Sequence, residues 1–187
     1  FDFVTALAMP MMFGLMAISK TFAPWFLGSE YVDTGKLMFL ESPIILFIAW
    51  SNVTGTQYLM PVNRVHEYTA SVTAGAISNV IFNLFFIKML GVNGAAIATV
   101  LSEFLVTAVQ VYCVRNTVRR RQLFKSVWKY LISGLLMFAV VYRVNGIMKM
   151  TIANLIVQVA IGAIIYLVGI LTLHAPIIDQ AKQFLKR

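Results

Sequence analysis

The amino-acid sequence predicts an all-α fold, a polytopic membrane helix bundle with six transmembrane helices. First, 60% of the 187 residues are hydrophobic and only 12% are charged, with a mean hydropathy of +0.83, which is too apolar for a soluble domain. Second, the apolar runs reach the roughly 20 residues that a helix needs to cross a bilayer. Third, the sequence lacks the short alternating segments that are typical of a transmembrane β-barrel.

The charge balance fits this class and argues against nucleic acid as a partner. The chain carries 15 Lys and Arg against 7 Asp and Glu, a net charge of +8, but the basic residues fall mainly in short segments between apolar runs. The single cysteine, Cys113, excludes an internal disulfide, and His66 and His174 lie far apart without ligand-like neighbours. We therefore expect no metal, no cofactor and no nucleic acid.

The first predicted span covers residues 3–27 and is interrupted by Pro10 and Pro24. Lys20 lies some five residues inside its far end. Its ammonium group either snorkels to the membrane surface or pairs with Glu41, which has a similar depth in the next span. The chain opens at Phe1 rather than at Met, so we expect a fragment that begins within a longer protein.

The second predicted span covers residues 37–60, and its second half is unusually polar for a transmembrane helix. Such a run is expected to face protein or a water-filled cavity rather than lipid. Asn52 and Gln57 are the candidate pathway residues within it.

The centre of the sequence is a predicted hairpin of two spans, residues 68–90 and 92–114, joined by the tight turn Gly91-Val92-Asn93-Gly94. Each span carries a polar stripe at steps of three or four residues, which places the stripe on one helix face. The stripes are Ser71, Gly75, Asn79 and Asn83 on the first span, and Thr99, Glu103, Thr107 and Gln110 on the second. Small residues on both spans favour close packing: Ala70, Ala74 and Ala76 on the first, Ala95, Ala96 and Ala98 on the second.

Asn79 and Glu103 are predicted to meet near the middle of the bilayer. Each lies 12 residues from Gly91 (91 − 79 and 103 − 91). At about 1.5 Å per residue, that distance is roughly 18 Å from the turn. A carboxylate at this depth is costly and by default marks a functional site, although a protonated or amide-paired Glu103 would also serve only to hold the helices together.

The remaining chain is predicted to form a basic cytoplasmic loop at 115–129, two plainer spans within 127–173, and an amphipathic surface tail at 176–187. Residues 1–114 would form the preceding four-span part. The positive-inside rule places both ends in the cytoplasm, since one side of the membrane receives ten Lys and Arg and the other receives four. The basic loop and Arg64 either reflect topology alone or attract a phosphorylated substrate.

The order of motifs resembles that of a known transporter family. The motifs are Gly55-Thr56-Gln57, Pro61-Val62-Asn63-Arg64, Glu67-Tyr68-Thr69, and the phrase from Gly91 to Val100 followed by Glu103. They resemble the C-terminal part of polysaccharide biosynthesis flippases of the Wzx type, in the multidrug/oligosaccharidyl-lipid/polysaccharide exporter superfamily. The resemblance covers roughly residues 1–114, and His66 departs from the lysine expected in that loop.

The resemblance implies two lobes with about 12 to 14 spans, of which this chain would supply the last six without the N-terminal lobe. It implies flipping of undecaprenyl-pyrophosphate-linked oligosaccharide across the bacterial inner membrane by alternating access, for cell-surface polysaccharide biosynthesis. Glu103 would bind a coupling proton or sodium ion, and Arg64 would meet the pyrophosphate. Asn79, Asn83 and Gln57 would contact sugar hydroxyls or order water. The full set of predicted pathway residues is Glu103, Asn79, Asn83, Gln57, Asn52, Gln110, Arg64, Lys20 and Glu41.

Other functions stay open. No catalytic triad, paired carboxylates, zinc motif or phosphate-cradling glycine loop is present, so we do not expect an enzyme. A cation-coupled drug antiporter of the same superfamily is the first alternative. A non-transporting membrane scaffold or a truncated remnant is the second.

Overall fold

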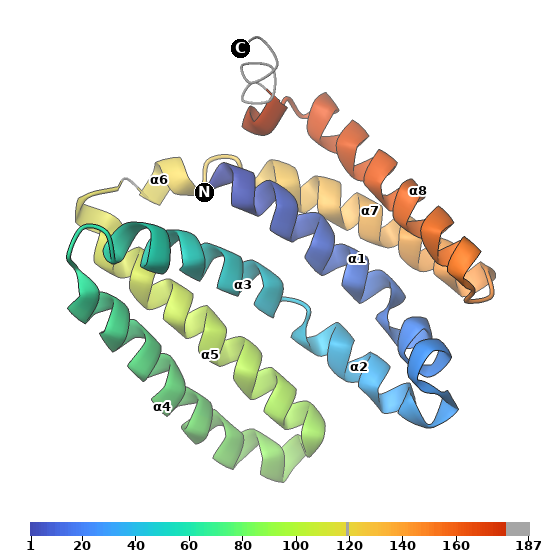
Figure 1. The fold of residues 1–187 in the computed structure, drawn as a ribbon, viewed down its shortest axis with the longest axis horizontal. Coiled ribbons are helices and arrows are strands. Elements are labelled where there is room, and N and C mark those ends of the chain that lie inside the picture. Colours follow the sequence, from blue (N-terminus) through green and yellow to red (C-terminus); the bar gives the residue numbers. More distant parts are fainter. Residues whose placement is uncertain (119, 179–187) are drawn as a thin grey trace. The chain divides into compact units, whose positions relative to one another are not determined.

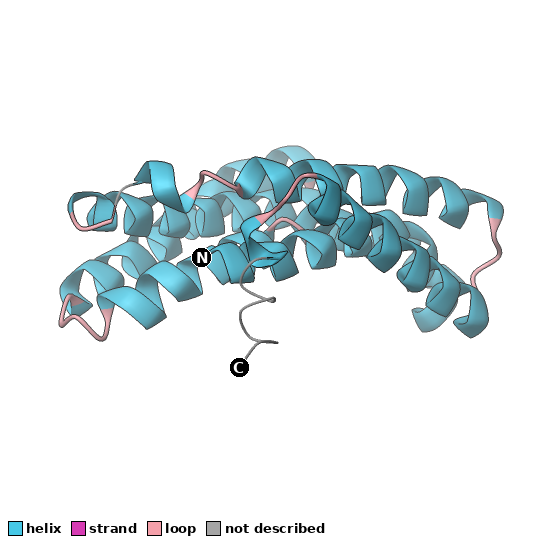
Figure 2. Ribbon diagram, turned by 90° about the horizontal axis from the view of Figure 1, so that it is seen from above, coloured by secondary structure: helices cyan, strands magenta, loops and turns pink. Residues whose placement is uncertain are grey.

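The computed structural model describes residues 1–118 and 120–178, and these residues form helices and connecting loops with no strand among them (Figures 1 and 2). The α-helices are α1 (Asp2–Leu27), α2 (Val32–Glu41), α3 (Ile44–Ser51), α4 (Val65–Leu90), α5 (Val92–Cys113), α6 (Arg120–Leu123), α7 (Val127–Ile147) and α8 (Ile152–Thr172). A π-helix, Asn52–Leu59, continues α3, and short 3-10 turns follow α1 and α5. The predicted all-α class is confirmed.

The chain forms two compact units. The first, which we call the hairpin unit, contains Phe1 and residues 43–123, and therefore α3 to α6. The second, the bundle unit, contains residues 2–42 and the described residues from 124 to 178, and therefore α1, α2, α7 and α8. In this grouping α1 packs against α7 and α8, and α2 packs against α1.

Among the described residues, five helices are long and apolar enough to cross a membrane: α1, α4, α5 with its following turn, α7 and α8. A sixth span results if α2 and α3 with its π-helix form one broken crossing. The chain is thus a multi-pass helical membrane protein with five or six spans.

Over the second predicted span, residues 37–60, the helix breaks at Ser42-Pro43, so any crossing there is a broken one. Proline has no N–H to continue the helical ladder, and α2 ends with both the N–H and the hydroxyl of Ser42 bonded to the Met38 carbonyl (3.1 and 2.6 Å). Further along, the N–H of Met60 bonds to the carbonyl of Gly55, five residues back (3.1 Å), which is the π-helical pattern. The polar run therefore lies in a π-helix.

In the hairpin unit, α4 and α5 pack closely along their length (Figure 1). Gly91 joins them with a φ of 59°, a left-handed conformation that favours glycine. A Cβ on Gly75 would lie 2.2 Å from a methyl group of Val106, so a side chain there would separate the helices. The predicted contact through Ala70 and Ala76 is wrong, because both are exposed, and Ser71 and Gly75 are the buried residues of α4.

In the bundle unit, α7 packs against both α1 and α8. Gly134 of α7 admits the ring of Phe13, and polar side chains bridge the helices. Asn145 accepts from the Thr21 hydroxyl (2.8 Å), and the Tyr166 hydroxyl donates to the Ala6 carbonyl (2.9 Å). Close approach at small residues and interhelical hydrogen bonds are the usual means of joining helices in lipid.

Candidate functional site

A polar hollow of about 380 Å³ lies in the hairpin unit, and we call it the Glu103 hollow. Three elements supply its walls: the last residue of α3 and the facing sides of α4 and α5. The lining residues are Ser51, Val72, Gly75, Ala76, Asn79, Ser102, Glu103 and Val106.

Asn79 and Glu103, which the sequence places at the same distance from Gly91, both line this hollow. Each is half-buried. Within the described chain, no hydrogen bond or ion pair engages the Glu103 carboxylate, so it is available to a proton, a cation or a hydroxyl donor. The nearby Ser102 hydroxyl is already used by its own helix, where it donates to the Ala98 carbonyl (2.8 Å).

Asn83 extends the polar face of α4 by one turn. Its amide donates to the side-chain oxygen of Asn79 (2.9 Å) and to the Asn79 carbonyl (2.8 Å). These two hydrogen bonds fix the orientation of the Asn79 amide oxygen. They leave the Asn79 NH₂ group as the donor on that side chain. Asn83 therefore positions Asn79, and only Asn79 reaches the hollow.

Gln110 does not line the hollow, although it continues the same stripe on α5. It is fully buried (0% exposed) and joins three helical segments. Its amide oxygen accepts from the hydroxyl of Thr54 in the π-helix (2.9 Å), and its amide nitrogen donates to the hydroxyl of Ser71 in α4 (3.1 Å). This placement makes Gln110 an interhelical bridge rather than a pathway residue.

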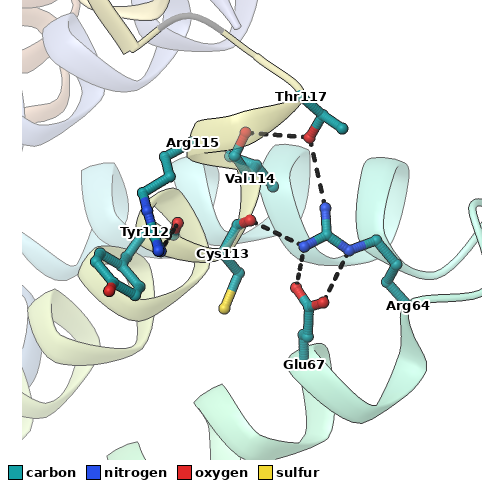
Figure 3. Close-up of polar contacts among 7 residues, drawn as sticks. All are labelled: Arg64, Glu67, Tyr112, Cys113, Val114, Arg115 and Thr117. Atoms are coloured by element: carbon teal, nitrogen blue, oxygen red, sulfur yellow. Dashed lines mark hydrogen bonds and ion pairs between the residues drawn. The ribbon is translucent and has the colours of Figure 1, made fainter.

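Arg64 also has a structural setting, at the ends of α4 and α5 (Figure 3). Its guanidinium pairs in a fork with Glu67, where Nε lies 2.9 Å from Oε1. The same group donates to the Cys113 carbonyl at the last residue of α5 (2.9 Å) and to the Thr117 hydroxyl (3.4 Å). Arginine commonly bonds the free carbonyls at a helix C-terminus, so Arg64 clamps the start of α4 to the end of α5.

Asn52 and Gln57 lie in the π-helix, and both are exposed. Asn52 accepts a hydrogen bond from the Thr56 hydroxyl (3.2 Å). Neither residue lines the Glu103 hollow.

Lys20 and Glu41 belong to the bundle unit, and the predicted ion pair between them is not formed. Both side chains are exposed, and the Lys20 ammonium lies 4.8 Å from the centre of the Phe39 ring. A lysine ammonium is attracted to the face of an aromatic ring by the ring quadrupole. The partner of the Lys20 ammonium is therefore Phe39 and not Glu41, which the sequence interpretation had suggested.

Two basic residues of the segment, Arg115 and Lys129, contact their own surroundings. Arg115 lies over the Tyr112 ring at 3.5 Å, and the Lys129 ammonium donates to the His174 carbonyl (2.8 Å). Arg119 lies outside the described residues. So does the predicted amphipathic tail beyond residue 178.

Sequence reasoning missed three contributors to the site region. Ser51 and Ser102 line the hollow, and Glu67 holds Arg64. The spacing of three residues between Arg64 and Glu67, on the first turn of a helix, was an available signal. Ser51 begins the polar run of the second predicted span, which was expected to face protein or a water-filled cavity, but it was not singled out as a site residue.

The chain was compared with known proteins in sequence and in structure. No protein-family model and no curated protein sequence matches the chain. The structure does match a solved structure, the lipid II flippase MurJ in an inward closed conformation, with a TM-score of 0.74 and 19% sequence identity. The chain has the fold of part of a lipid II flippase. The match covers 88% of this chain and 35% of MurJ, so the chain spans about a third of that protein's length. It agrees with a flippase fold and does not select the Wzx-type branch.

Proposed function

We propose that this chain is part of a membrane flippase that moves lipid-linked oligosaccharide from the inner to the outer leaflet, by alternating access, for cell-surface polysaccharide biosynthesis. The carrier we propose is undecaprenyl pyrophosphate, and the branch is the Wzx type. The observation that carries the proposal is the unbonded Glu103 carboxylate beside Asn79, in a hollow roughly halfway along two membrane-length helices. Ionisable residues at such a depth usually mark a substrate or ion pathway.

The residues of the Glu103 hollow divide into two proposed roles. Glu103 binds the coupling proton or sodium ion, since a carboxylate changes its charge when either one binds. Asn79, held in place by Asn83, donates to sugar hydroxyls or to ordered water. Asn52 and Gln57 on the exposed face of the π-helix are proposed to contact the glycan outside this hollow, where exposed amides meet hydroxyl groups.

The structure gives less support to direct pyrophosphate binding by Arg64. Its guanidinium already bonds Glu67, Cys113 and Thr117. We propose that Arg64 acts as a clamp, and that any attraction of the pyrophosphate comes from the summed charge of the basic segment. The bacterial inner membrane, with both ends of the chain in the cytoplasm, is the proposed location.

The rest of the transport pathway is proposed to come from an N-terminal lobe. The match covers 35% of MurJ, so a transporter of that length contains about twice as much further sequence, and we propose that this sequence includes the N-terminal lobe. The lobe and the lipid bilayer are therefore the proposed partners of this chain.

The proposal is tested with the intact gene in its host. We expect Glu103→Gln to reduce surface glycan and raise the pool of lipid-linked oligosaccharide in the cytoplasmic leaflet, at normal protein level. Glu30→Gln, which alters an exposed loop carboxylate, is the matched control and is expected to change neither quantity.

Three outcomes separate the alternatives. Normal glycan and normal lipid pools in Glu103→Gln would reduce Glu103 to a packing role. Unchanged glycan after full deletion, with raised sensitivity to cationic dyes, would favour a drug antiporter. No effect of deletion on either would favour a scaffold or a remnant.

A further inference from the structure

A second hollow, of about 390 Å³, lies within the bundle unit, and we call it the Gln158 hollow. It is formed by α1, α7 and α8 and is lined by apolar side chains such as Leu7, Met11, Met137 and Val159. Gln158 of α8 is the single side chain with hydrogen-bonding groups among its lining residues.

Gln158 is fully buried (0% exposed), and neither its amide oxygen nor its amide nitrogen has a hydrogen-bond partner within the described chain. An amide that is buried without partners is energetically costly, and the cost is greater where no water competes. The terminal torsion of glutamine is broad, so rotation about it sets which of the two amide atoms faces the hollow that Gln158 lines. The site thus combines an apolar chamber with one free donor and one free acceptor.

We propose that the Gln158 hollow binds a membrane lipid whose acyl chain fills the chamber and whose ester carbonyl accepts a hydrogen bond from the Gln158 amide nitrogen. The volume lies within the range of small-ligand sites, and an apolar wall with one polar anchor is their usual composition. The ligand class is an ester-linked glycerolipid.

The position of Gln158 along α8 suits such a ligand. It lies six residues after Ile152 (158 − 152), which is about 9 Å along the helix axis. A helical side chain points back toward the N-terminus, so the amide lies nearer still to that end of the span. Ester groups lie at the edge of the hydrocarbon core, within reach of this level.

The same chemistry argues against the isoprenoid tail of the proposed flippase substrate as the occupant. A polyprenyl chain is a hydrocarbon up to its phosphate, so it would fill the chamber and leave the Gln158 amide unbonded. The site we propose is therefore distinct from the transport pathway, and it does not depend on the proposed function.

The test places the chain in nanodiscs that contain equal amounts of diacyl phosphatidylglycerol and its dialkyl ether analogue, with matched chain lengths. Native mass spectrometry then measures which lipid remains bound after ejection. The ether lipid lacks only the carbonyl, so we expect the wild-type chain to retain the ester form about fivefold over the ether form, the effect of one hydrogen bond.

Two variants separate the anchor from the chamber. Gln158→Leu is expected to retain lipid without preference between ester and ether. Ala163→Phe, on the exposed rim of the hollow, is expected to lower retention of both lipids, whereas Ala160→Phe, on the same helix but not in the hollow, is the matched control and should behave as wild type.

Equal retention of ester and ether lipids by the wild type would overturn the proposal. So would an ester preference that persists in Gln158→Leu. Unchanged retention in Ala163→Phe would also overturn it, because the hollow would then be covered by something other than lipid, such as another protein segment.

Discussion

Gln110 and Gln158 are both glutamines on membrane-length helices, and both are completely buried, yet their surroundings are opposite. Gln110 bonds to Thr54 and Ser71, on two neighbouring segments of the hairpin unit. Gln158, in the bundle unit, has no hydrogen-bond partner in the described chain and borders a hollow. A satisfied amide joins helices, whereas an unsatisfied one is a candidate for binding something else.

The comparison separates two uses of polarity inside a membrane protein. Membership of a polar stripe on a helix face made Gln110 look like a pathway residue, but its bonding partners lie on other segments, Ser71 on α4 and Thr54 in the π-helix. Gln158 stands alone on a plain span, so nothing on the facing helices meets it. Membership of a stripe does not by itself supply a partner, since Glu103 lies on the same stripe as Gln110 and has no hydrogen bond or ion pair within the described chain.

The largest expected effect on stability comes from Gly94→Ala, in the hairpin unit that contains Gln110. A Cβ at Gly94 would lie 2.0 Å from the Phe86 carbonyl oxygen, so α4 and α5 must move apart. We expect a loss of about 3 kcal/mol in the free energy of unfolding, measured by SDS titration in mixed micelles.

Gly146→Ala is the control for that measurement. It lies near the end of α7, and a Cβ there meets nothing within 4 Å. Because alanine is the better helix former, we expect unchanged or slightly higher stability. Equal losses in both variants would show that the close approach at Gly94 is not what holds the hairpin.

The second effect compares the two glutamines directly. Gln110→Leu removes two interhelical hydrogen bonds, and we expect the free energy of unfolding to fall by about 1 to 2 kcal/mol. Gln158→Leu removes an unbonded amide from an apolar wall, so stability should stay the same or rise. Both are measured by the same SDS titration, and similar losses in the two variants would contradict the distinction.

The sequence was sufficient for the fold class because hydropathy and span length depend only on composition along the chain. The turn at Gly91 and the facing stripes of α4 and α5 were predictable for the same reason, since they are local patterns. Pro43 is a local signal for the break at Ser42-Pro43. The span was nevertheless predicted to run through it, because the residues around it are apolar. The grouping of α1 with α7 and α8 was not predictable, because contacts between segments so distant in sequence leave no local pattern.

The candidate site was predictable in part. Equal distance from Gly91 was enough to bring Asn79 and Glu103 together. The roles of Arg64 and Gln110 were not, since each depends on partners that only packing reveals. A polar residue in a span indicates that a polar group is buried at a cost in free energy. The sequence does not say whether a neighbouring helix, a ligand or water offsets that cost.

A smaller effect is expected at Arg64, a further bonded polar group of the hairpin unit. Arg64→Lys keeps the charge but cannot form the fork to Glu67 and the bond to Cys113 together. Because both side chains of the pair are about a third exposed (28% and 36%), solvent weakens the loss to about 1 kcal/mol in the free energy of unfolding.

Lys36→Met is the matched control for the clamp, since Lys36 pairs with Asp33 at the same spacing but on an exposed surface (56% and 87%). We expect no measurable change in stability for it. A loss of flipping in Arg64→Lys at unchanged stability would instead give Arg64 a role in transport.

The smallest effect is expected for Lys20 and Glu41 of the bundle unit, in a double-mutant cycle with Lys20→Met and Glu41→Gln. Lys20 contacts the Phe39 ring rather than Glu41, so each single change should cost less than about 0.5 kcal/mol in the free energy of unfolding. The coupling energy between the two should be zero within error, whereas the same cycle on Ser71 and Gln110 should return about 0.6 kcal/mol. A Lys20–Glu41 coupling above about 1 kcal/mol would mean that the charged groups meet in the membrane, since only direct pairing couples two such groups this strongly. The bundle unit would then contain a bonded charge pair. Of the buried glutamines and the charge pairs compared between the two units, Gln158 alone would be left without a partner in the described chain.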